Sequence, residues 1–137
     1  MARLEVEGID ELISDLMELG NLDDVAPKMI NAATPVMVKN MKRNIKAAAN
    51  RGYATGELAE SIRATKAKQN IYGYFAAVGP VGTDSKGTRN AEKMAYLEYG
   101  TSNQQAHPVM EKTMNDSEED IIKRMQQIFD KEAKNEG

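Results

Sequence analysis

The sequence predicts a single α+β domain, in which a small antiparallel sheet, made of an N-terminal strand and a hairpin, packs with two to three longer helices. Apolar residues recur at spacings of three, four and seven in two long segments, which is typical of amphipathic helices. Short alternating segments near the N-terminus and within residues 61–78 are typical of half-buried strands. The length of 137 residues is that of one ordinary domain, so we expect residues 1–137 to form one unit.

Composition restricts the function. Aromatic residues make up 5% of the chain, Trp is absent and there are nine Met, so we expect an aliphatic core without a large aromatic-lined pocket. The absence of cysteine excludes disulfides and thiolate chemistry, and it favours folding in a reducing cytoplasm. No apolar run approaches the ~18–20 residues of a membrane span, and no signal-peptide pattern opens the chain. We therefore expect it neither to cross nor to enter a membrane.

The N-terminal region predicts a short strand followed by a short helix. Residues 3–7 alternate between polar and apolar side chains, and Gly8 then ends the pattern. Asp10 is a suitable N-cap for an amphipathic helix that ends at Gly20.

A longer helix is predicted from Asp24 to about Asn50, with Pro27 in its first turn, where a missing amide does no harm. Pro35 removes a hydrogen bond and clashes with the preceding turn, so the helix should kink or restart near Thr34. Beyond this point one side of the helix is apolar, through Met37, Met41, Ile45 and Ala48.

Charge is distributed unevenly along a chain whose net charge is −3. Residues 1–24 hold eight acids and one base, whereas residues 25–51 hold six bases and no acid. Within residues 37–48 a basic stripe should lie on the outer side of the helix, formed by Lys39, Lys42, Arg43 and Lys46. These opposite charges could pair within the domain or between neighbouring copies, and a row of cations also suits nucleic-acid phosphates.

The middle of the chain predicts the hairpin. Residues 61–68 and 71–78 should form two strands joined at residues 69–70. One face would carry Tyr72, Tyr74, Ala76 and Val78. Residues 79–89 are rich in turn formers and should form a mobile loop without helix or strand. We expect this loop to order only against a partner or another copy, with candidate contacts at Pro80, Asp84, Lys86 and Arg89.

The C-terminal region predicts a short helix and a long one. Asn90 should cap the short helix, which ends at Gly100, and its inward side chains would be Ala91, Met94, Ala95 and Leu97. After a polar loop to Pro108, the long helix carries apolar residues from Met110 to Ile128, with a possible restart at Ser117 or Asp120. Residues 134–137 should fray.

Catalytic and ligand-binding signals are weak. His107 is the only histidine and stands in a polar loop, so a surface or packing role is favoured over a general base. Residues 79–88 combine glycines, a lysine and hydroxyls, but Lys86 precedes Gly87, and no helix follows directly as a phosphate-binding loop requires. We therefore expect no catalytic residue, no cofactor and no metal.

Two segments carry specific motifs: residues 55–62 read T-G-E-L-A-E-S-I, and residues 96–101 read Y-L-E-Y-G-T, followed by A-H-P at residues 106–108. Together they resemble a family of tailed-phage neck proteins, known as head-tail joining or tail-completion proteins. Residues 55–62 resemble its T-G-x-L-x-x-S-I segment, and residues 96–108 resemble its E-[YF]-G-T segment and the proline that precedes its last helix. Where the family often has an aromatic residue after this proline, the chain has Val109. The matching residues are Thr55, Gly56, Leu58, Ser61, Glu98, Tyr99, Gly100, Thr101 and Pro108.

In physical terms, Gly56 and Gly100 suit turns, Glu98 and Thr101 could fix the loop, and Pro108 suits the start of a helix. The resemblance implies a non-enzymatic, ring-forming virion subunit of a phage or prophage, assembled in the bacterial cytoplasm. Its implied partners are other copies of itself, head-closure proteins and tail-terminator or tail-tube proteins, with DNA passing nearby in the channel. The alternatives are a small nucleic-acid-associated protein that uses the basic stripe and a small hydrolase that uses His107 with a carboxylate.

Overall fold

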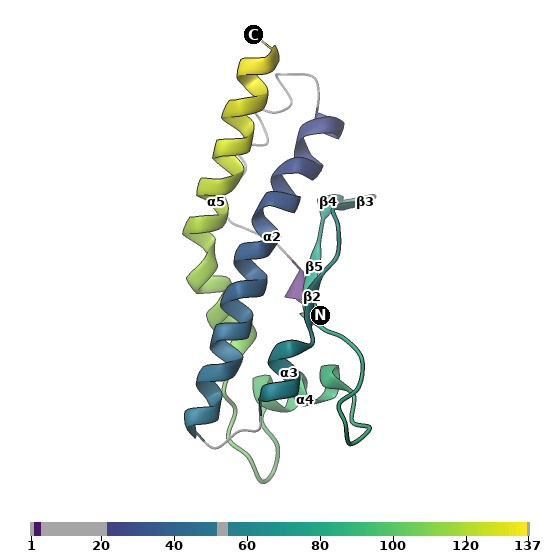
Figure 1. Cartoon of the computed structure of the whole chain (residues 1–137), viewed down its shortest axis with the longest axis vertical. Helices are drawn as coiled ribbons and strands as arrows, with labels where there is room; N and C mark the ends of the chain where they lie inside the picture. Colours follow the sequence, from purple (N-terminus) through teal and green to yellow (C-terminus); the bar gives the residue numbers. More distant parts are fainter. Residues whose placement is uncertain (1, 4–21, 52–54, 137) are drawn as a thin grey trace.

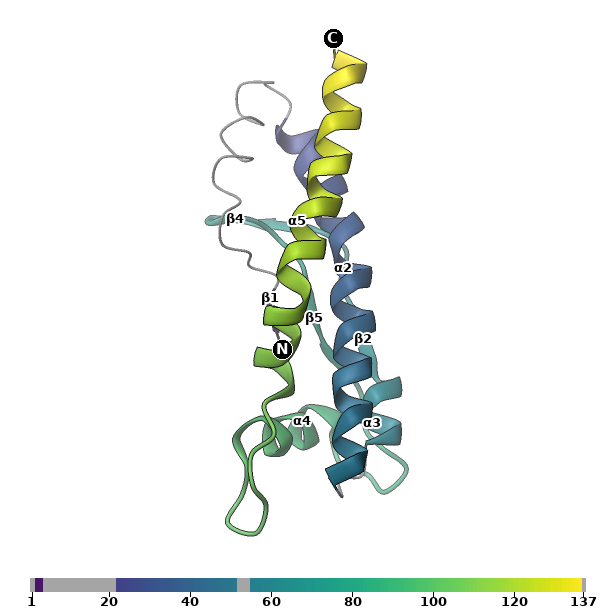
Figure 2. The ribbon, with the colours of Figure 1, turned by 90° about the vertical axis from the view of Figure 1, so that its left-hand side faces the viewer.

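Two long helices form the frame of the molecule in a computed structural model that describes residues 2–3, 22–51 and 55–136. These helices are α2 (Leu22–Ala47) and α5 (Val109–Glu136), which run side by side along the long axis (Figure 1). Figure 1 shows α2 between α5 and a small sheet, and Figure 2 shows the two helices side by side from another direction. The α+β class and the packing of a small sheet against helices are thus confirmed. Most of the predicted first strand and the predicted helix at residues 10–20 lie outside the described residues.

α2 runs unbroken through Pro35, so the predicted restart near Thr34 is wrong, and the alternative, a kink, stays a prediction. A proline lacks the amide that would bond to the carbonyl four residues earlier, here that of Asn31. The Thr34 hydroxyl donates to this carbonyl instead, at 3.3 Å. The helix also begins at Leu22, which places Pro27 in its second turn. After Ala47 the chain continues in a short 3₁₀ helix, η1 (Ala48–Arg51).

α5 is also continuous, and the predicted restart at Ser117 or Asp120 is wrong. Ser117 is fully buried against α2, where its hydroxyl oxygen accepts a hydrogen bond from the Asn40 amide at 2.8 Å. Because this hydroxyl has a partner on the neighbouring helix, it does not cap a new one. The helix extends to Glu136, so three of the four residues predicted to fray belong to it.

The sheet has three antiparallel strands in the order β1 (Ala2–Arg3), β5 (Ala77–Pro80) and β2 (Ile62–Ala64). Ile62 pairs with Pro80 and Ala2 with Val78. Between β2 and β5 the chain forms a separate hairpin of β3 (Lys68–Asn70) and β4 (Gly73–Phe75). The predicted hairpin therefore exists, but it is divided into two paired sections.

The turn of this hairpin lies two residues later than predicted. Asn70 pairs with Gly73, which leaves Ile71 and Tyr72 at the tip instead of in a strand. The Asn70 side chain accepts a hydrogen bond from the Tyr72 amide at 2.8 Å, and Gly73 adopts a positive φ of 128°. An asparagine and a glycine around a two-residue tip account for this position. Of the four side chains predicted to share a face, Ala76 and Val78 are buried, whereas Tyr72 is not.

Polar contacts tie the hairpin to α2. The Tyr74 hydroxyl donates to Asp23 at the start of α2, and this hydrogen bond raises the pKa of Tyr74 to about 12. Further along α2, the Asn31 side chain accepts a hydrogen bond from the Ala67 amide at 2.8 Å. The hairpin is thus fixed to the same helix that organises the core.

The core surrounds α2. Met37, Met41, Ile45 and Ala48 are all fully buried, which confirms the predicted apolar side of the helix. The remaining elements contribute Leu58, Ile62, Val78, Met94, Leu97, Val109, Ile121 and Met125. Every one of these side chains is aliphatic or a thioether, as the low aromatic content predicts.

Two short helices close the lower end of the molecule in Figure 1: α3 (Gly56–Glu60) and α4 (Asn90–Tyr99). Asn90 was predicted to cap α4, but it is the first residue of the helix, and Arg89 occupies the N-cap position. The Asn90 side chain is buried and donates to the Val81 carbonyl at 2.9 Å. Met94 and Leu97 face inward as predicted, whereas Ala91 and Ala95 are exposed.

Candidate functional site

Residues 79–89 are structured, contrary to the prediction of a loop without regular structure. Gly79 and Pro80 are buried and belong to β5. Thr83 and Arg89 form an isolated β-bridge, and between them the Asp84 amide donates to the Thr88 carbonyl at 2.8 Å. The turn-forming composition thus specifies a closed hydrogen-bonded turn. The mobility of residues 79–89 stays a prediction, and these hydrogen bonds argue against it.

Asp84 organises this turn from within. Its carboxylate accepts hydrogen bonds from the amides of Lys86 and Thr88, each at 2.9 Å. It also forms an ion pair with Lys93 of α4 at 3.0 Å, and only 8% of its side chain is exposed. The hydrogen bond from Lys93, followed by that from the Thr88 amide, lowers the pKa of Asp84. Asp84 therefore joins the turn to α4, and its predicted contact with a partner stays a prediction.

A second carboxylate holds the tip of the turn on α3. Glu57 accepts hydrogen bonds from the amide and the hydroxyl of Ser85, each at 3.1 Å. Of the four predicted contact residues in this segment, Pro80 and Asp84 thus contribute to the fold. Lys86 and Arg89 remain exposed.

The segment at residues 55–62 builds α3 and its link to the sheet. Thr55 is buried, and its carbonyl accepts a hydrogen bond from the Ala59 amide at 2.9 Å. Leu58 is in the core, and the Ser61 hydroxyl donates to the Leu58 carbonyl at 2.7 Å. Gly56 opens the helix without a positive φ, and a Cβ there would meet no atom within 4 Å. The expectation that Gly56 occupies a turn is therefore wrong.

The segment at residues 98–108 fixes the start of α5. The Glu98 carboxylate accepts hydrogen bonds from the amides of Met110 at 2.7 Å and Glu111 at 3.3 Å, in the first turn of that helix. These amides have no acceptor within the helix itself, so Glu98 caps α5 from α4. Pro108 directly precedes Val109, the first residue of α5, as predicted for a helix start.

Gly100 adopts a φ of +79°, which confirms the predicted need for glycine. A Cβ at this position would lie 2.9 Å from both the Ala106 amide nitrogen and the Gln104 carbonyl oxygen. Thr101 bridges to Gln104, and its hydroxyl oxygen accepts a hydrogen bond from the Asn103 amide at 3.2 Å, so it fixes the loop as expected. The loop therefore folds back closely on the end of α4.

Among the described residues, the most exposed large apolar and aromatic side chains gather at two separate places. At the hairpin tip, Ile71 is 90% exposed and Tyr72 is 87% exposed. On α4, Tyr99 is 81% exposed and Tyr96 is 43% exposed. Figure 1 shows that the hairpin projects sideways from the helix pair, away from the lower end where α4 lies. The alternating pattern predicted Tyr72 in a strand. The signal for a tip at this position was the pair of turn-forming residues, Asn70 and Gly73, on either side of residues 71–72.

The basic stripe lies on the outer side of α2, as predicted, and acids of neighbouring elements neutralise part of it. Arg43 forms an ion pair with Asp116 of α5 at 3.2 Å, and Lys46 approaches Glu60 of α3 at 4.0 Å. Asp116 also accepts a hydrogen bond from Lys112, which is the main cause of its lowered pKa. Among the described residues, the acids that pair with the stripe are thus Glu60 and Asp116.

Lys39, which forms no ion pair with the other described residues, borders a groove of about 480 Å³ between α2 and α5. Arg124 contributes to its wall and donates to the Ala32 carbonyl at 3.5 Å. The contribution of α5 to this groove could not be predicted from the sequence, because spacing within one helix does not reveal which other helix lies beside it. The groove is lined by Pro35, Val36, Lys39, Asn40, Asp120, Lys123, Arg124 and Gln127.

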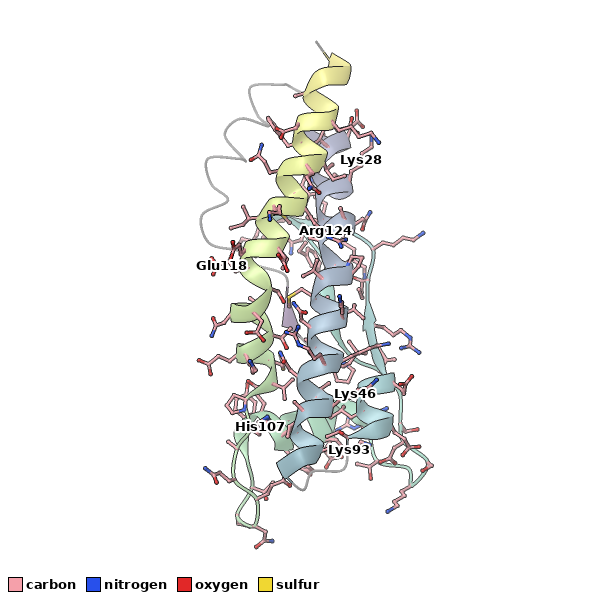
Figure 3. The ribbon with its side chains drawn as sticks, turned by 60° about the vertical axis from the view of Figure 1, so that its left-hand side comes forward. Lys28, Lys46, Lys93, His107, Glu118 and Arg124 are labelled. Atoms are coloured by element: carbon pink, nitrogen blue, oxygen red, sulfur yellow. The ribbon has the colours of Figure 1, made fainter. Side chains whose placement is uncertain are left out.

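His107 lies in the loop that precedes α5, where its amide donates to the Leu97 carbonyl at 2.7 Å (Figure 3). In the part of the chain that the structure describes, no three His, Cys, Asp or Glu side chains gather as metal ligands. None of the described helices is long and apolar enough to cross a membrane.

Comparison with protein-family models gives no match, and comparison with curated proteins and with solved structures finds no similar chain. A function can therefore be proposed only from the surfaces described above and from the two motif segments.

Proposed function

We propose that this chain is a non-enzymatic structural protein of a tailed phage or prophage, a ring-forming subunit of the neck or tail-completion complex that joins head to tail. It would assemble in the bacterial cytoplasm and remain in the virion. Its partners would be other copies of the chain, a head-closure protein on one side and a tail-terminator or tail-tube protein on the other. The geometry of residues 98–110 carries this proposal.

In that segment the motif residues hold the backbone, while one side chain is left for contact. Glu98 caps α5 and Gly100 allows the loop to pass within van der Waals distance of α4. Tyr99, between them, is 81% exposed. Fixing the backbone on both sides of an exposed tyrosine reduces the entropy lost when that tyrosine binds a partner. This arrangement suits a residue that contacts a neighbouring protein.

The separation of the two apolar surfaces gives further support. A ring subunit between head and tail must contact neighbours on several sides, and Tyr and exposed aliphatic side chains are typical of such contacts. The hairpin tip displays Ile71 and Tyr72, and α4 displays Tyr96 and Tyr99. Two such surfaces on one small domain suit a subunit with several partners better than one with a single ligand.

Electron microscopy of lysates tests the proposal. Deletion of the gene from the phage or prophage that encodes it should leave separate heads and tails, and the wild-type gene supplied in trans should restore joined particles. Supplying Tyr99→Asp should restore few of them, whereas Lys131→Asp, an exposed position near the end of α5 and away from both motif segments, should restore them fully. Normal yields of joined particles after deletion would refute the proposal.

The groove beside Lys39 favours a second candidate function, that of a small nucleic-acid-associated protein. Lys123 and Arg124 extend the cationic surface from α2 onto α5, as phosphate binding along two helices would require. Binding of short duplex DNA that weakens steeply with salt, and that is lost in Lys39→Glu together with Lys123→Glu, would favour this function. Asp116 and Asp120 on the same face would repel phosphates and argue against it.

A further inference from the structure

The face shared by α2 and α5 carries positive charge that the described residues do not neutralise. Lys39, Lys42 and Lys123 form no ion pair within the described ranges, and Lys39 and Lys123 line the groove. Lys46 is 60% exposed and lies 4.0 Å from an even more exposed Glu60, an ion pair weak enough to exchange its partner. A partner with matching negative charge could therefore bind here without disrupting a strong internal contact.

The opposite side of α5 carries the complementary charge. Figure 3 shows Glu118 on the side of α5 that faces away from α2, whereas Lys28, Arg124 and Lys46 lie along the helix pair. Glu111 and Glu118 are exposed, and their carboxylates form no ion pair in the described part of the chain. One molecule thus presents a cationic surface and an anionic surface on different sides.

The spacing of the charges on the two surfaces matches. Glu111 and Glu118 are seven residues apart on α5, and Lys39 and Lys46 are seven residues apart on α2. Seven residues make two helical turns, so each pair spans roughly 10.5 Å along one side of its helix. Two such helices placed side by side can bring both lysines opposite both glutamates at the same time.

We infer that the α2–α5 face of one copy docks on the outer side of α5 of a second copy, with Lys39 and Lys46 opposite Glu111 and Glu118. The contact joins two different surfaces, so it repeats from copy to copy and can close a ring, unlike a twofold dimer. This inference rests on the proposed function, since it assigns the contact between ring subunits. Asp116 and Asp120 within the cationic face favour a protein helix over a phosphate backbone, because a protein can place its own cations opposite them.

Charge reversal with rescue tests this contact. Variant A is Lys39→Glu with Lys46→Glu, variant B is Glu111→Lys with Glu118→Lys, and variant C combines all four changes. Sedimentation at low salt should show at least tenfold weaker self-association for A and for B, and recovery for C. Unchanged thermal melts would show that all three variants fold. The inference would be overturned if all variants associated as strongly as the wild type, or if variant C associated as weakly as A and B. It would also be overturned if the wild type bound duplex DNA and both A and C had lost this binding.

Disulfide trapping applies the same test inside assembled particles, because the chain contains no cysteine of its own. Particles assembled from a mixture of Lys39→Cys and Glu118→Cys chains should yield cross-linked dimers on oxidation. A mixture of Lys39→Cys with Gln126→Cys, an exposed position elsewhere on α5, should not. Wild-type chains that stay monomeric in solution and particles that give no Lys39–Glu118 cross-link would overturn the contact. Loss of joined particles on gene deletion would still leave the proposed function standing.

Discussion

The helix pair and the lower end of the molecule are held together by different interactions. Between α2 and α5 the interface is apolar and its buried hydrogen bonds join neutral side chains, Asn40 to Ser117 and Asn44 to Thr113. At the lower end, carboxylates accept hydrogen bonds from backbone amides: Glu57 and Asp84 from the turn at residues 82–89, and Glu98 from the first turn of α5. The helix pair should therefore depend on packing, whereas the lower end should depend on backbone geometry and ionisation.

Gly100→Val should have the largest effect on the lower end. The substitution forces a β-branched residue into a φ of +79° and places Cβ 2.9 Å from two backbone atoms. We expect the free energy of unfolding to fall by about 3 kcal/mol or more, because strain and steric overlap add. Chemical denaturation measures the change. Gly56→Ala, where a Cβ meets no atom within 4 Å, is the control and should cost nothing. An unchanged midpoint for Gly100→Val would show that the loop adjusts without cost.

Asn40→Ala should have the next largest effect, this time within the helix pair. It removes the donor to the fully buried Ser117 hydroxyl. Burying an oxygen that has lost its partner costs about 1–3 kcal/mol, and the vacated volume adds to this. Replacing both partners, as Asn40→Leu with Ser117→Ala, should recover much of the loss in the same denaturation experiment. A double variant that is less stable than Asn40→Ala alone would contradict this account.

Glu98→Ala should have a smaller and more local effect. It leaves the amides of Met110 and Glu111 without their acceptor, as the loss of a helix cap does. Such losses cost about 1 kcal/mol, and they loosen the first helical turn. Hydrogen exchange at Met110 should accelerate in Glu98→Ala and less in Glu98→Gln, while exchange at the middle of α5 should not change. Uniform acceleration along α5 would mean that Glu98 supports the whole fold.

Acidification should produce the smallest effect, and at the lower end it should act through Asp84. The pKa of Asp84 is lowered in the folded state, so its contribution to stability is present above the ordinary carboxylate value of about 3.9 and is lost as pH falls from there through the folded pKa. Asp84→Asn should therefore flatten the decline of stability below about pH 4. The pKa of Asp116 is also lowered, so Asp116 should account for part of the decline of stability that remains in Asp84→Asn. An equally steep decline in Asp84→Asn would exclude Asp84 as a contributor.

The same contrast explains which features the sequence could predict. Periodic spacing identified both long helices and the buried side of α2, because each helix must bury one continuous stripe. It could not show that Thr34 satisfies the carbonyl left free by Pro35, or that Ser117 meets Asn40, since both depend on side-chain orientation. The structure of residues 82–89 was missed because Glu57, which holds its tip, lies 28 residues from Ser85, and because the contacts of Asp84 depend on the orientation of its side chain.

For the candidate site, the roles of Gly100 and Glu98 could be predicted because both residues belong to a recognisable motif and both act on neighbouring backbone. The exposure of Ile71 and Tyr72 was missed because a shift of two residues in the turn moves both from a strand to the tip. The cationic groove was missed because it depends on the contact between two helices that are separated by more than sixty residues.

Quantitative mass spectrometry of purified joined particles tests the central proposal most directly. If the chain is a ring subunit of the neck, particles should contain it in a fixed number of copies relative to a tail-tube protein, and stringent washing with salt should not remove it. Cryo-electron microscopy of the same particles should place paired helices of the length of α2 and α5 in a ring at the head–tail junction. Infectious, joined particles that contain no copy of this chain would contradict the proposal.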